Sequence, residues 1–158
     1  YKGKTLNFIA RYLQKSHDRR EIWGFDSFEG LPNDWLGYIM TKESFDLKNK
    51  IPKLNNNIKL SAGFFDKSLP LWVKKNLNND SFISLIHIDS DLYSSCKVIL
   101  ENLSAYIKKD TLILFDEYFA YPNWQKHEFL AFKEFIISKK ISYEYLGYYE
   151  QKVLVKIL

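Results

Sequence analysis

Acidic side chains recur in this sequence directly after short apolar runs. Asp89 and Asp91 follow one such run, and Asp116 and Glu117 follow the next. Carboxylates at the end of a buried strand are costly unless a partner pairs with them. Mg²⁺ prefers carboxylate and water oxygens in octahedral geometry, with few protein ligands. Asp89 or Asp91, together with Asp116 and Glu117, therefore predicts a site for a hard divalent cation.

A third acid, Asp26, closes the run over residues 21–26. An acid in this position of a nucleotide-binding sheet accepts hydrogen bonds from ribose hydroxyls. For any one acid alone, a helix cap or a loop anchor is the competing interpretation. Three clusters in equivalent positions favour a shared site instead.

The elements that must position these acids alternate between strand-like and helix-like patterns. Strands are predicted over residues 21–26, 58–62, 82–88 and 111–115, with two more in a terminal hairpin over 143–158. Helices are predicted near residues 5–16, from 68 to about 77 with Pro70 in the first turn, from 94 or 95 to 107, and over 124–139. Residues 33–57 read as a loop that holds one short helix at most.

This alternation predicts an α/β fold with a parallel sheet, right-handed crossovers and an antiparallel last strand. In such sheets ligands bind outside the carboxyl ends of the strands. All three acidic clusters are expected at that edge.

Composition limits the class of protein. The 158 residues fit one domain, and a hydrophobic content of 46% supplies a core. No apolar run approaches the roughly 20 residues that a membrane span needs. The single cysteine, Cys96, excludes an internal disulfide and fits a cytoplasmic protein. The net charge is +4, but the lysines are dispersed, which argues against a nucleic-acid partner.

Four motifs give the sequence a specific resemblance. They are GFDSFEGLP (24–32), AGFFDKSLP (62–70), HIDSDLYSS (87–95) and LILFDEYF (112–119). In order and spacing they resemble the successive motifs of the macrocin O-methyltransferase (TylF-type) family, which is similar in fold and metal use to catechol O-methyltransferase. The resemblance implies a Rossmann-like class I methyltransferase fold that uses S-adenosylmethionine. It also implies that the family's first strand and the start of its glycine loop are missing from residues 1–158.

The resemblance implies a role for each matching residue. The cofactor would be held by Tyr1, Gly3, Thr5, Asp26, Ser27, Phe28, Gly63 and Phe64. The metal ligands would be Asp89, Asp116 and Glu117, the last standing where relatives often carry Asp or Asn. Asp91 is the first candidate for the general base, and His127 is the second. His87 is expected to be a hydrogen-bonded residue behind the acids.

The predicted function is Mg²⁺-assisted O-methylation of a hydroxyl group on a sugar or a glycosylated small metabolite. The prediction is of a single domain, and it is compatible with homo-oligomers. Three alternatives stay open. The first is a metal-independent methyltransferase that acts on another acceptor, and the second is a non-catalytic or remnant domain with the same fold. The third, prompted by the basic pI of about 9.0, is modification of a nucleic acid.

Overall fold

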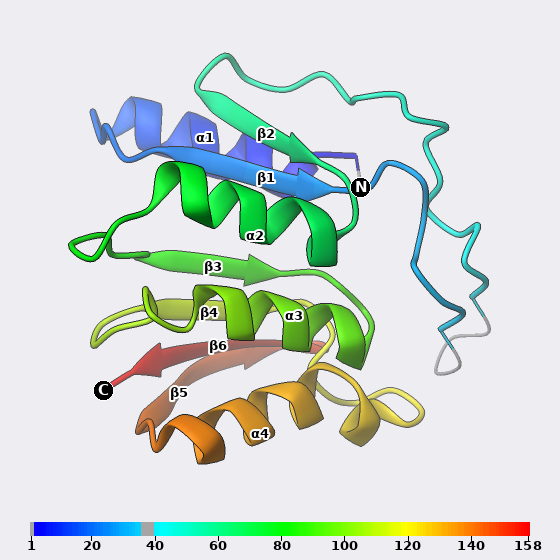
Figure 1. The fold of residues 1–158 in the computed structure, drawn as a ribbon, viewed down its shortest axis with the longest axis vertical. Coiled ribbons are helices and arrows are strands. Elements are labelled where there is room, and N and C mark those ends of the chain that lie inside the picture. Colours follow the sequence, from blue (N-terminus) through cyan, green and yellow to red (C-terminus); the bar gives the residue numbers. More distant parts are fainter. Residues whose placement is uncertain (1, 36–39) are drawn as a thin grey trace.

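The computed structural model describes residues 2–35 and 40–158, which form alternating strands and helices (Figure 1). β1 (Ile22–Asp26) and β2 (Ile58–Ala62) make a parallel pair. A second sheet has the strand order β3-β4-β6-β5, built from β3 (Leu85–Ile88), β4 (Leu112–Phe115), β5 (Tyr143–Tyr149) and β6 (Lys152–Ile157). β3 and β4 are parallel, whereas β6 is antiparallel to both of its neighbours. The predicted α/β class and terminal hairpin are therefore confirmed.

Four α-helices and one 3₁₀-helix cover the strands of this described region. They are α1 (Lys4–Lys15), α2 (Phe65–Asn76), α3 (Tyr93–Leu103), η1 (Trp124–Lys126) and α4 (Glu128–Lys139). Figure 1 shows α2, α3 and α4 on one face of the strands and α1 on the other. No helix in the described part of the chain has the length and apolar character needed to cross a bilayer.

The core lies between the larger sheet and its helices. Its fully buried members include Leu100 of α3, Ile113 and Phe115 of β4, Phe132 of α4 and Val155 of β6. Each such side chain contributes roughly 1.5–3 kcal/mol by leaving water. This packing fixes α3 and α4 against β4, the strand that carries Asp116 and Glu117 at its end.

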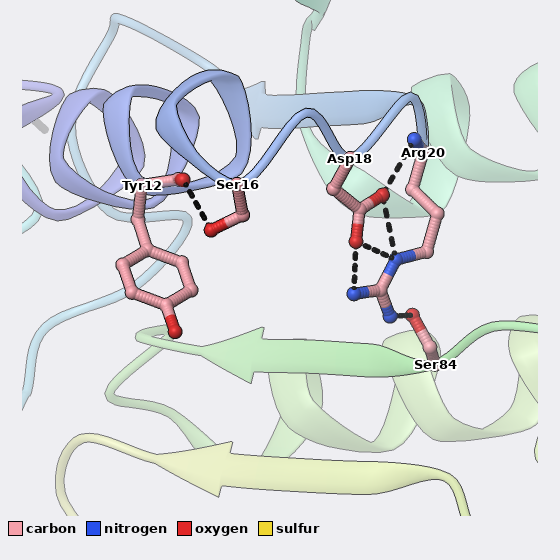
Figure 2. Close-up of polar contacts among 5 residues, drawn as sticks. All are labelled: Tyr12, Ser16, Asp18, Arg20 and Ser84. Carbon is pink, nitrogen blue, oxygen red and sulfur yellow. Dashed lines mark hydrogen bonds and ion pairs between the residues drawn. The ribbon is translucent and has the colours of Figure 1, made fainter.

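Strand pairing is interrupted between the two sheets. Among the described residues, β1 pairs only with β2, and β3 pairs only with β4, although Figure 1 shows β1 and β3 running in the same direction. Arg20, which precedes β1, links the two sides of this break, because its guanidinium contacts both Asp18 and Ser84 (Figure 2). The Nη1 atom of Arg20 lies 3.1 Å from Oγ of Ser84.

Two predicted boundaries were wrong on the amino-terminal side. α2 begins at Phe65, so that Pro70 lies inside the helix and not in its first turn. The backbone N–H groups of Lys67 and Ser68 donate to the carbonyl of Phe64 at 3.0 and 2.9 Å and set this earlier start. β3 begins at Leu85 and not at residue 82, since the backbone of Ile83 bonds to Tyr106 and to the side chain of Thr111.

Two predicted helix starts also need correction. Neither Ser94 nor Ser95 caps α3; Leu92 occupies the N-cap, and no side chain caps it. The predicted helix over residues 124–139 is divided at His127, whose φ of −113° and ψ of −127° are not helical. Within the loop over 33–57, the described residues form no helix.

Candidate active site

A large cavity opens along the break between β1 and β3, with a volume of about 1570 Å³. Residues predicted to bind the cofactor line it together with three of the acids. The lining includes Gly3, Thr5, Asp26, Ser27, Phe28 and Phe64, and it includes Asp89, Asp91 and Glu117. Because β1 and β3 are parallel, the residues that follow them meet at one edge of the strands, as the sequence predicted.

Three carboxylates gather closely at the ends of β3 and β4. One oxygen from each of Asp89, Asp116 and Glu117 lies within 4.8 Å of the other two. Three carboxylate oxygens at this spacing are a suitable donor set for Mg²⁺, which takes oxygen ligands and keeps several waters. The Oε2 atom of Glu117 is buried and has no hydrogen-bond partner, so it is available to a cation. These residues fit the predicted metal.

Asp116 is the member of this group whose pKa is lowered. Its Oδ1 lies 3.1 Å from Nε2 of His87, and its Oδ2 accepts a hydrogen bond from Nζ of Lys152 at 2.5 Å. Burial alone would raise the pKa of Asp116, but the contacts with His87 and Lys152 outweigh it and lower this pKa to about 2. The prediction of a hydrogen-bonded histidine behind the acids is confirmed for His87.

The pKa values of Glu117 and Asp91 are raised, in contrast to that of Asp116. Burial, together with the charges of Glu128 and Asp91, raises the pKa of Glu117 to about 10. Burial, with the charges of Asp89 and Asp116, raises the pKa of Asp91 to about 7. Both shifts favour the protonated acid, and the positive charge of a bound cation would oppose them.

Asp26 ends β1 in a tight turn. Its Oδ1 accepts a hydrogen bond from the backbone N–H of Phe28 at 2.8 Å. The hydroxyl of Ser27 donates to the carbonyl of Gly30 at 2.8 Å, which closes the same turn. Phe28 is buried and has a φ of 60°. The three residues thus form a turn that lines the cavity, and Asp26 is partly buried there.

The remaining predicted cofactor residues lie at the starts of two helices. Gly3 precedes α1 with a φ of 68°, and a Cβ atom there would lie 2.5 Å from Cδ2 of Leu54, so no other residue fits without a shift. Thr5 is exposed in the first turn of α1. Phe64 is the N-cap of α2, and Gly63 has a φ of 118° beside it. Tyr1 lies outside the described residues.

His127 is held in an aromatic environment. Its ring contacts Trp35 and Tyr121, with centroid distances of 6.4 and 6.1 Å. Burial lowers the pKa of His127, which favours the neutral ring. Its Nδ1 is buried and has no hydrogen-bond partner. His127 precedes Glu128 and lies near the acids, but Asp91, and not His127, lines the cavity described above.

Two residues of this region were not expected from the sequence. Lys152 reaches Asp116 from β6, and Glu128 reaches Ser90 from α4. Both contacts join segments more than thirty positions apart, and no local pattern marks either residue. The one available signal was that Glu128 interrupts an apolar helical stripe.

Comparison with known proteins agrees with this architecture. A chain of "CalS11, Calicheamicin Methyltransferase" superposes with a TM-score of 0.70 at 20% identity, covering 98% of this chain and 68% of that one. The apo structure of CalS11, described as a TDP-rhamnose 3′-O-methyltransferase, gives 0.66 at 22% identity, with coverages of 98% and 67%. The O-methyltransferase NovP gives 0.66 at 19% identity, with coverages of 94% and 65%. At these identities the likeness establishes the fold.

A search among curated proteins gave no match. The model of one family, "Macrocin-O-methyltransferase (TylF)", matches residues 1–144, which is most of the chain. The chain therefore belongs to the TylF macrocin O-methyltransferase family.

Proposed function

We propose that this protein transfers a methyl group from S-adenosylmethionine to a hydroxyl of a sugar-containing small molecule, assisted by Mg²⁺. The observation that carries the proposal is the gathering of Asp89, Asp116 and Glu117 within 4.8 Å, beside a cavity that Asp26 also lines. The structural neighbours support the acceptor class, since one of them is described as a TDP-rhamnose 3′-O-methyltransferase.

In this proposal the acids at the cavity have different roles. Asp26 accepts hydrogen bonds from the ribose hydroxyls, while Gly3 and the start of α1 hold the methionine part of the cofactor. Asp89, Asp116 and Glu117 hold the cation. When bound, the cation polarises the acceptor hydroxyl and orients it, which makes the oxygen a better nucleophile at neutral pH.

Asp91 is the proposed general base. Its carboxyl group is buried, two positions from Asp89 among the proposed cation ligands. As the acceptor oxygen takes the methyl group, its proton passes to Asp91, and the sulfonium becomes a neutral thioether. Holding the two reactants in line can supply roughly 7–11 kcal/mol of the barrier. His127 stays the second candidate.

We also infer that a parallel β-strand occupies the break between β1 and β3 in the complete domain. Among the described residues β1 and β3 each pair on one side only, and residues of both strands line the cavity. The resemblance to the family supports this inference, because it implies a first strand and the start of a glycine loop that residues 1–158 lack. An apolar segment ending in Glu-x-Gly directly before Tyr1 in the complete protein would support the inference.

The test is methyl transfer to a panel of nucleotide sugars and glycosides, measured with and without a chelator. The proposal expects turnover that is lost with the chelator and restored by Mg²⁺. Turnover that survives chelation would favour the metal-independent alternative. Failure of the complete protein to bind S-adenosylhomocysteine in a calorimetric titration would favour a non-catalytic domain. RNA binding with a steep salt dependence would favour the nucleic-acid alternative.

A further inference from the structure

Glu128 is a carboxylic acid in the interior of the protein. It is the first residue of α4, and its exposed fraction is 0%. Its Oε1 accepts two hydrogen bonds from one residue, at 3.0 Å from the backbone N–H of Ser90 and at 3.0 Å from the Ser90 hydroxyl. A buried carboxyl group is costly for the fold, so a residue of this type at this position requires a compensating role.

Ser90 stands between the two acids that follow β3, and the backbone there is strained. The N–H of Leu92 donates to the carbonyl of Ser90 at 2.6 Å, which closes a three-residue turn around Asp91. Asp91 has a φ of 62°, in the left-handed region that residues other than glycine seldom adopt. Such conformations cost about 1–3 kcal/mol and persist only where the surroundings impose them. The hydrogen bonds between Glu128 and Ser90 belong to the surroundings that impose this conformation.

We propose that Glu128 is a positioning residue that holds the turn at Ser90. In this turn Asp89 faces the other two cation ligands, while Asp91 faces the acceptor. Its two hydrogen bonds fix the residue midway between these acids, from a helix packed on the other side of the turn. The effect on catalysis rests on the proposed function. The effect of Glu128 on the turn, here called the clamp, does not.

Glu128 is separate from the group that would hold the cation. The close cluster consists of Asp89, Asp116 and Glu117, whereas the Glu128 side chain accepts its hydrogen bonds from Ser90. Besides its electrostatic effect on Glu117, it therefore acts on Asp89 and Asp91 through the backbone of Ser90. In metal sites, removal of a group that orients a ligand typically weakens metal affinity or activity by 10- to 100-fold.

Three substitutions isolate this role. Glu128→Gln keeps an oxygen toward Ser90 and the size of the side chain. Glu128→Leu keeps the volume but removes both hydrogen bonds. Ser90→Ala removes the hydroxyl bond alone and retains the backbone bond. Glu134→Gln serves as the control, because this carboxylate lies on the same helix and is about half exposed.

Two measurements keep the clamp and the proposed function apart. Amide hydrogen exchange over residues 87–93 reports on the turn whether or not a metal binds. Mn²⁺ affinity, with kcat and KM for methyl transfer, reports on the consequence. In Glu128→Leu we expect faster exchange in this segment but unchanged exchange in β4 and β6. We also expect Mn²⁺ affinity and kcat to fall by roughly 10- to 100-fold, with KM within about twofold.

Glu128→Gln and the control are expected to match the wild type. If Glu128→Leu does not fold, Ser90→Ala decides, with an expected loss of Mn²⁺ affinity of roughly twofold to tenfold for one hydrogen bond. Unchanged exchange over 87–93 in the folded variants overturns the positioning role. If Glu128→Leu exchanges faster over 87–93 but the wild-type protein binds no Mn²⁺, the positioning of the turn is supported and the proposed function is overturned.

Discussion

The ammonium group of Lys152 lies 2.5 Å from Oδ2 of Asp116, on the carboxylate that the proposed cation would share. Lys152 comes from β6, and Asp116 ends the neighbouring strand β4. The lysine neutralises Asp116 in the absence of a metal, so a divalent cation must compete with it.

Removal of this competing charge should tighten metal binding. In Lys152→Gln we expect the Mn²⁺ dissociation constant to fall by about threefold to fivefold, because a partly exposed ion pair contributes about 1 kcal/mol. Titration of Mn²⁺ monitored by electron paramagnetic resonance measures this value. Lys156→Gln, on the same strand but paired with Asp110, is the matched control. Weaker Mn²⁺ binding in Lys152→Gln alone would show that the lysine supports the site.

Asp116→Ala should abolish metal-dependent turnover and leave cofactor binding largely intact. The substitution removes a central cation ligand, but it does not touch the turn at Asp26. Methyl transfer and calorimetric titration with S-adenosylhomocysteine measure the two properties. Asp110→Ala, at the other end of β4 and exposed, should behave as the wild type. Normal turnover of Asp116→Ala with Mg²⁺ would remove Asp116 from the metal site.

Asp26→Ala should weaken cofactor affinity by roughly 1.5–3 kcal/mol, the value of hydrogen bonds to a charged group. Since Asp26 also accepts the N–H of Phe28, Asp26→Asn provides a variant that retains this turn. We expect both variants to bind S-adenosylhomocysteine less tightly than the wild type. Asp46→Ala removes a similar turn contact, to the N–H of Lys48, and should not change affinity. Equal dissociation constants for Asp26→Asn and the wild type would exclude a role for the charge in binding.

The raised pKa of Glu117 predicts a pH dependence of stability in metal-free buffer. Between its ordinary value of 4.5 and about 10, the unfolded chain has lost the Glu117 proton that the folded protein keeps. Stability therefore falls as the pH rises through this window, by about 1.4 kcal/mol per pH unit for this one group. In Glu117→Gln the slope should be shallower by about that amount between pH 7 and 9.

Denaturant unfolding with a chelator present measures these slopes. Glu134→Gln is the control, because hydrogen bonding to Tyr93 lowers the pKa of Glu134 and its titration is complete below this range. A Glu117→Gln slope equal to that of the wild type would show that Glu117 is ionised in the folded protein.

The fold was largely predictable because its signals are local. Residues 58–62 form a strand with the predicted bounds, since a β-rich run there is flanked by Asn55–Asn57 and by Gly63. The acids were expected at one edge because parallel strands place their carboxyl ends together. Boundaries failed where a long-range contact decided them, as at Ile83, whose carbonyl bonds to the side chain of Thr111.

The site was predictable in its acids but not in the residues that set their charge. The apolar stripe of the predicted helix over residues 124–139 begins at Phe129, so the apolar period gave no sign of the break at His127. Lys152 and Glu128 act on residues 36 and 38 positions away, and such contacts depend on how the strands and helices pack. Asp116 and Glu117 are adjacent in the sequence, but their pKa shifts are opposite. Burial and the charge of Glu128 raise that of Glu117, whereas His87 and Lys152 lower that of Asp116.

The most direct test of the account places both ligands in one pocket. Mn²⁺ and S-adenosylmethionine are added to the complete protein, and nuclear magnetic resonance records the relaxation of the cofactor methyl protons. We expect strong paramagnetic broadening of these protons in the wild type, and none in Asp116→Ala at the same cofactor occupancy. Bound cofactor and bound Mn²⁺ without any broadening of the methyl signal would contradict it.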